Sequence, residues 1–174
     1  RRSSDLPLPQ HGTLCLTNSA ITGGGKTLAV YAYGVEHCLS NHKVLGVYPT
    51  NELLQDQKRA VCKLFQEIYG RLPTEGIDGE LLVVDGEFLR QEKEPGEKNI
   101  KIIEYILSSA KIVLTNPDIL YLLCHHLYAS SREMTGRNIT AFSVLMRDFR
   151  TVIFDEFHLY NIKQQASILW IVGL

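Results

Sequence analysis

The stretch SAITGGGKTLAVYAYG, residues 19–34, contains three consecutive glycines followed by Lys26 and Thr27. Apolar side chains recur at helical spacing over residues 26–40, so the glycines are expected to lead into a helix. Glycine amides can converge on a phosphate, because no side chain obstructs them and the helix N-terminus adds partial positive charge. The general form of such a phosphate loop, G-x-x-x-x-G-K-[ST], begins with glycine, whereas Ala20 occupies that position here.

Each residue type in this loop has an expected role. The backbone amides of Gly23, Gly24 and Gly25 would hold phosphate groups. Lys26 would reach the β- and γ-phosphates, and the hydroxyl of Thr27 would bind Mg²⁺. The alternative interpretation is a glycine-rich turn followed by a solvated lysine.

Short apolar runs alternate with helical segments along the rest of the chain. The runs that read as buried strands are residues 12–18, 43–50, 111–116 and 151–158. This alternation predicts βαβ crossovers and an α/β fold, a mostly parallel sheet with helices on both faces. Residues 76–98 depart from this alternation, because Asp85-Gly86 lies between two short apolar runs that precede a charged segment. We therefore expect a hairpin and loop insertion there.

Two acids stand at the end of the last predicted strand. Ligands bind at the carboxyl ends of parallel strands, and Asp155 and Glu156 follow an apolar run at such an end. Asp155 would associate with Mg²⁺, and Glu156 could orient and deprotonate an attacking water. A strand ending in Asp-Glu can also be an ordinary surface turn. Together with the upstream glycine loop, the pair predicts nucleotide hydrolysis.

Two further strand ends carry short polar side chains, Thr50 and Asn116. Each precedes a predicted helix, so each can cap that helix and do nothing more. The functional alternative is contact with the phosphates of a nucleic acid. The sequence leaves both alternatives open.

The bulk composition fits one soluble globular domain. The chain has 174 residues, 45% of them hydrophobic, and a formal net charge of −1, so overall charge does not draw it to nucleic acid. Its four cysteines form no C-x-x-C pair and are expected to be free thiols. No apolar run approaches the ~18 residues of a membrane span, which predicts a cytoplasmic protein without membrane contact. The abrupt end at Leu174 suggests a segment of a longer protein.

The loop has the form A-x-T-G-x-G-K-T, which resembles the phosphate loop of superfamily 2 helicases. The matching residues are Ala20, Thr22, Gly23, Gly25, Lys26 and Thr27. PTNELLQDQ, residues 49–57, resembles motif Ia, LTNPD resembles the motif Ib region, and DEFH is a D-E-x-H motif II. This resemblance implies that residues 1–174 form the first RecA-like P-loop NTPase domain of a helicase motor.

Within that superfamily, DEFHLYN, residues 155–161, resembles the D-E-x-H-x-Y-[DN] of CRISPR-associated type I helicases. The phenylalanine in motif II, and the lack of a histidine-aspartate nuclease signature, resemble the type I-D subunit without a fused nuclease. The resemblance implies an antiviral helicase acting on single-stranded DNA, in an effector complex with a separate nuclease subunit.

Roles follow from this resemblance. Lys26 and Thr27 would bind ATP and Mg²⁺, Asp155 would hold Mg²⁺ through water, and Glu156 would be the catalytic base. His158 would couple the nucleotide to a partner domain. Full activity would require a second motor domain, which closes the active site.

The resemblance also bears on residues outside these motifs. Thr50 and Asn116 would contact the backbone of single-stranded DNA, and Gln10 lies where an adenine-reading glutamine could stand. Two other functions stay open. One is another superfamily 2 enzyme, such as a restriction-type translocase or an RNA helicase, and the other is a nucleotide-gated scaffold for proteins in which hydrolysis is dispensable.

Overall fold

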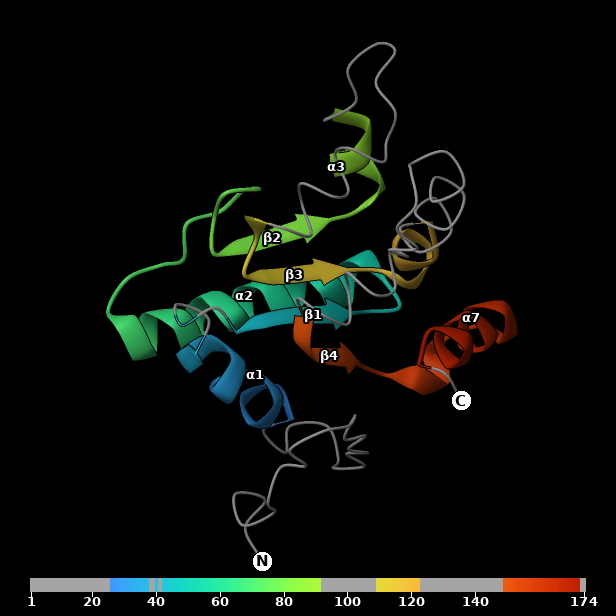
Figure 1. The fold of residues 1–174 in the computed structure, drawn as a ribbon, viewed down its shortest axis with the longest axis horizontal. Coiled ribbons are helices and arrows are strands. Elements are labelled where there is room, and N and C mark those ends of the chain that lie inside the picture. The colour runs from blue at the N-terminus through green and yellow to red at the C-terminus, as the bar shows by residue number, and fades with distance from the viewer. Residues whose placement is uncertain (1–25, 38–39, 41, 92–108, 123–148, 173–174) are drawn as a thin grey trace, which may run out of the picture.

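The computed structural model describes residues 26–37, 40, 42–91, 109–122 and 149–172 (Figure 1). The elements in chain order are α1 (Lys26–His37), β1 (Lys43–Val47), α2 (Asn51–Tyr69), β2 (Leu81–Val84), α3 (Gly86–Gln91), β3 (Ile112–Thr115), β4 (Phe149–Phe154), the 3-10 helix η3 (Phe157–Leu159) and α7 (Ile162–Val172). Residues 117–122 are also helical, as the proline at the start of that segment predicts. The strand expected at residues 12–18 lies outside the described residues.

The four strands form one sheet in the order β2-β3-β1-β4. All three pairings are parallel, with Val44 of β1 opposite Ile112 of β3 on one side and Thr151 of β4 on the other. This confirms the predicted parallel sheet. The strand arrowheads in Figure 1 point toward α7 and the helix at residues 117–122, so these helices follow the carboxyl edge of the sheet.

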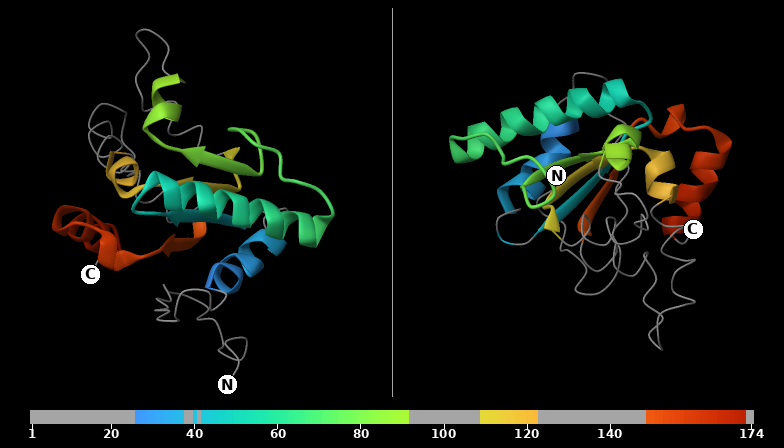
Figure 2. Two further views of the ribbon diagram at one scale, coloured as in Figure 1. Left: turned by 180° about the vertical axis from the view of Figure 1, so that it is seen from behind. Right: turned by 90° about the horizontal axis from the view of Figure 1, so that it is seen from above.

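Helices α1 and α2 cover one face of the sheet (Figure 2), and the apolar cluster beneath them joins both helices to β1 and β3. A second cluster on the other face includes Ile119 and Leu120 of the helix at residues 117–122. Every residue of β1 and β3 is buried, since both faces of the sheet are covered. The prediction of helices on both faces is therefore confirmed.

The hairpin predicted within residues 76–98 is wrong. Residues before Asp85 form β2, which pairs in parallel with β3, and residues after it form helix α3. The carboxylate Oδ1 of Asp85 accepts hydrogen bonds from the backbone N–H of Glu87 at 3.0 Å and of Phe88 at 2.8 Å. Asp85 thus caps a helix instead of turning a hairpin, which is an equally common use of aspartate. Residues 92–98 lie outside the described residues.

Helix α2 follows Thr50, where the sequence predicts a helix. Gly70 ends it in the left-handed conformation, with φ 70°, and its N–H donates to the carbonyl of Gln66 at 2.9 Å. Leu54, Val61, Leu64 and Phe65 form the buried side of α2, whereas Ile68 is 39% exposed. None of the helices in the described segments is long and apolar enough to cross a membrane.

Candidate active site

The predicted catalytic acids follow β4 directly. The N–H of Asp155 donates to the carbonyl of Val47, the last residue of β1, at 3.1 Å. The turn after β4 therefore starts against the carboxyl end of the neighbouring strand. Asp155 lies where a parallel sheet binds its ligands.

The predicted phosphate loop falls largely outside the described residues, including Thr22, Gly23, Gly24 and Gly25; Gln10 lies outside them as well. Helix α1 begins at Lys26, with Thr27 as its second residue. The residues from Lys26 onward are thus helical, as the sequence predicts. That the N-terminal end of this helix binds phosphate stays a prediction.

Glu156 has a left-handed backbone conformation, with φ 48° and ψ 46°. Among the described residues it is the only one other than glycine with positive φ. Such conformations cost energy and often occur at active sites. Its N–H donates to Oδ1 of Asp155 at 3.0 Å, and its side chain is 26% exposed. The Nδ1 atom of His158 lies 3.3 Å from Oε2 of Glu156, so the predicted coupling residue does lie beside the predicted base.

Three buried tyrosines surround this turn. The hydroxyls of Tyr31 and Tyr48 share a hydrogen bond, and the hydroxyl of Tyr160 donates to the carbonyl of Val47 at 2.8 Å. Burial raises the pKa of all three phenols, and the negative charge of Asp155 raises the pKa of each further. All three therefore remain neutral hydroxyls at physiological pH. Sequence reasoning missed this cluster, although Tyr160 belongs to the DEFHLYN stretch.

Thr50 and Asn116 both act as helix caps. The hydroxyl of Thr50 accepts from the N–H of Leu53 at 3.3 Å, and Oδ1 of Asn116 accepts from the N–H of Ile119 at 2.9 Å. The structural alternative for each side chain is thus observed. Contact of either residue with nucleic acid stays a prediction.

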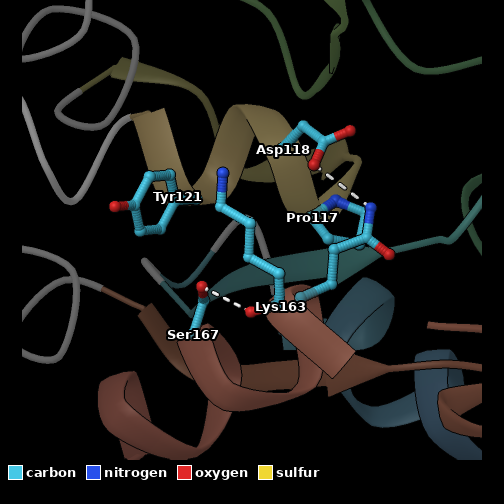
Figure 3. A pocket seen from close by; sticks show the side chains of 6 residues that line it. Pro117, Asp118, Tyr121, Lys163 and Ser167 are labelled. Atoms are coloured by element: carbon cyan, nitrogen blue, oxygen red, sulfur yellow. Dashed lines mark hydrogen bonds between the residues drawn. The ribbon is translucent and has the colours of Figure 1, made fainter. Parts of the chain in front are cut away.

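A cavity of about 280 Å³ lies at the same edge, between the helix at residues 117–122 and α7 (Figure 3). Its lining residues are Pro117, Asp118, Tyr121, Lys163, Gln164 and Ser167. The ammonium of Lys163 lies 5.5 Å from the ring centroid of Tyr121. The side-chain amide of Gln164 donates to Oδ1 of Asp118 at 3.1 Å, joining two segments that are far apart in the sequence.

The carboxylate of Asp155 is a suitable ligand for the expected Mg²⁺. The described residues contain no cluster of three or more histidine, cysteine or carboxylate side chains that could enclose an ion. Mg²⁺ does not need such a cage, because it keeps several waters and binds one or two carboxylates together with substrate phosphates. A single carboxylate at the carboxyl edge of the sheet suits that mode of binding.

The DEAD/DEAH box helicase family matches residues 12–173. Among solved structures, the crystal structure of the DUF1998 helicase MrfA is similar, with a TM-score of 0.49 and 23% sequence identity over 87% of this chain and 21% of that one. No curated protein matches the chain. Because the family match spans almost the whole sequence and includes the motifs described above, this chain belongs to the DEAD/DEAH box helicase family.

Proposed function

We propose that this chain is the ATP-hydrolysing half of a motor that moves along single-stranded DNA. The observation that carries the proposal is the Asp155-Glu156 pair at the carboxyl end of β4, held against β1. This chain spans 21% of the length of the similar solved helicase. A second motor domain would complete the site.

The residues of the chain divide the chemistry between them. Lys26 and Thr27 would bind the triphosphate and its metal, and Asp155 would hold the metal through water. Mg²⁺, when bound, neutralises charge on the phosphates. Glu156 would orient the attacking water and accept its proton. His158 lies against Glu156, so it can transmit the state of the nucleotide to a facing domain.

Steady-state ATP hydrolysis by the purified protein, with and without single-stranded DNA, tests this proposal. Glu156→Gln should retain ATP binding and lose turnover by about a hundredfold or more, because the amide cannot accept the proton. Lys26→Ala should weaken both binding and turnover. Glu67→Gln, an exposed change on α2, is the matched control. Undiminished turnover of Glu156→Gln would refute the assignment.

The cavity beside Tyr121 and Lys163 supports contact with a single strand. Within the part of the chain that the structure describes, Lys163 has no ion-pair partner, and the ring of Tyr121 is partly exposed. An ammonium binds phosphate, and an exposed aromatic ring stacks on bases. Tyr121 lies on the helix that follows β3, and Lys163 lies on α7, which follows β4 and the acids.

Binding of fluorescein-labelled single-stranded DNA and RNA, measured by anisotropy over a range of salt concentrations, tests this surface. Lys163→Ala should weaken binding several-fold and reduce the salt slope by about 1, since one phosphate contact is lost. Lys63→Ala, which removes an exposed lysine from α2, should have no effect. Equal affinities of wild type and Lys163→Ala for the labelled strands would exclude the cavity as a nucleic-acid binding surface. Tighter binding of RNA would favour the RNA-helicase alternative.

The DEFHLYN stretch supports a narrower role in CRISPR interference, in a complex with a separate nuclease subunit. A plasmid-challenge assay in cells carrying the Glu156→Gln variant tests this role. Loss of interference would support it. Interference that persists without ATP turnover would instead favour the scaffold function.

A further inference from the structure

The turn that carries Glu156 is held in a conformation that its own sequence does not favour. Glu156 is left-handed without being glycine or asparagine, the residues that tolerate this region best. A bond network must therefore hold the residue in place. The same network then decides where the carboxylate lies.

One carbonyl group anchors both sides of this turn. The Val47 oxygen accepts a hydrogen bond from the N–H of Asp155 at 3.1 Å and another from the hydroxyl of Tyr160 at 2.8 Å. Asp155 immediately precedes Glu156, and Tyr160 ends the 3-10 turn that follows it. Val47 is fully buried in β1, which pairs with strands on both sides. Its carbonyl is thus a fixed point.

The downstream side of Tyr160 is equally constrained. The side chain of Asn161 accepts from the N–H of Gln164 at 2.9 Å, and the side chain of Gln164 accepts from the N–H of Asn161 at 3.1 Å. This reciprocal pair is a capping box that starts α7. It fixes the backbone next to Tyr160, a residue that is 3% exposed. The tyrosine and asparagine of DEFHLYN thus have structural tasks beside the acids.

We propose that Tyr160 is a positioning residue for catalysis, which holds Glu156 in its productive orientation through the carbonyl of Val47. This inference rests on the proposed function. Tyr160 acts through the backbone turn and has no direct role with the nucleotide. Its hydroxyl closes the turn on the side opposite Asp155.

Tyr160→Phe removes the hydroxyl and keeps the ring. In the purified protein, with DNA-stimulated ATP hydrolysis as readout, kcat should fall about tenfold, since misplacement of a catalytic group by a fraction of an ångström has effects of this size. The KM for ATP and the affinity for a fluorescent ATP analogue should stay close to wild type. The unfolding temperature should fall by only a few degrees, because the carbonyl of Val47 keeps its hydrogen bond from the N–H of Asp155. Tyr33→Phe is the matched control, because Tyr33 is 53% exposed on α1.

A double-mutant cycle separates positioning from a general structural effect. If Tyr160 acts through Glu156, adding Tyr160→Phe to Glu156→Gln should lower the residual turnover no further. An additive loss would overturn the inference. An unchanged kcat, or a parallel loss of nucleotide affinity or folded protein, would overturn it as well.

The same data set distinguishes this inference from the proposed function. If Glu156→Gln abolishes turnover and Tyr160→Phe retains the wild-type kcat, only the positioning role fails. If Glu156→Gln turns over ATP like wild type, the proposed function fails and the inference falls with it.

Discussion

Gly46 is the position in the central strand where a single added carbon should have the largest effect. A Cβ atom there would overlap the hydroxyl oxygen of Tyr31 and lie 2.9 Å from Cε2 of Tyr48 and 3.0 Å from Cδ2 of Leu114. Strand β1 cannot shift to relieve these contacts, because it is hydrogen-bonded to β3 and β4. The ring of Tyr31 must therefore move and leave its hydrogen bond with Tyr48.

The expected cost of Gly46→Ala has two parts. Overpacking a filled core costs about 1–3 kcal/mol. Separating two buried hydroxyls, each of which then lacks its partner, adds about 1–3 kcal/mol. We expect a loss of about 3 kcal/mol in the free energy of unfolding, a large share of the ~5–15 kcal/mol that stabilises typical domains.

Tyr31→Phe provides the test of this reasoning, since it removes the atom in closest conflict. Alone it should cost about 1–2 kcal/mol, because the hydroxyl of Tyr48 loses its partner. In that background Gly46→Ala should cost about 1–2 kcal/mol less than in wild type, with Tyr48 and Leu114 still crowded. Urea unfolding of the purified protein, followed by far-ultraviolet circular dichroism, gives the four free energies.

Gly86→Ala is the control, because a Cβ atom there meets nothing within 4 Å. It should be neutral or slightly stabilising. Strict additivity of Gly46→Ala and Tyr31→Phe, or a Gly46→Ala variant as stable as wild type, would refute the proposed conflict with Tyr31.

Two further predictions concern the ends of α2 and β2. Arg71, which hydrogen-bonds the carboxylate of Glu80 at 2.6 and 2.7 Å, is the main cause that lowers the pKa of Glu80 to about 2. Because the folded pKa lies below the unfolded one, this stabilisation is present above pH ~4.5 and is lost as the pH falls toward 2. Because Arg71 is half-exposed, we expect Glu80→Gln to lower the free energy of unfolding by only about 1–2 kcal/mol at pH 7, and by progressively less toward pH 3. A difference in urea midpoint between wild type and Glu80→Gln that does not narrow as the pH falls would contradict this. Gly70→Ala should lower the free energy of unfolding by about 1 kcal/mol and Gly70→Asn by less, because Gly70 has φ 70° and open space around it. Equal losses of unfolding free energy for both variants in the same urea assay would show that backbone strain is not the cause.

The sequence predicts this fold best where local pattern and tertiary packing agree. Buried β1 and β3 read as continuous apolar runs, and Thr50 and Gly70 mark the ends of α2. The hairpin predicted from the Asp85-Gly86 pair is wrong, because the same dipeptide suits a hairpin and a helix start. The choice between them depends on β3, a partner that is distant in the sequence.

The candidate site likewise contains residues that the sequence predicts and residues that it does not. Asp155 and Glu156 were predictable, because their position after an apolar strand carries the chemistry by itself. The contacts of Tyr31, Tyr48 and Tyr160 were not, because these residues lie on different elements and follow no common period. Only the folded sheet brings them around the same turn.

The short segment of residues 46–50 explains why the core and the site are hard to separate in this domain. Gly46 leaves room for the tyrosine pair, the carbonyl of Val47 holds the turn of Glu156, and Thr50 caps α2. Changes in this segment should therefore alter stability and ATP turnover together. Lys163 lies on the exposed surface of α7 and lines the cavity. A substitution of Lys163 can therefore change the contacts to a ligand while the core keeps its packing. We therefore expect substitutions near the predicted hydrolytic residues to lower the stability of the domain, and substitutions on the surface proposed to contact DNA to leave it unchanged.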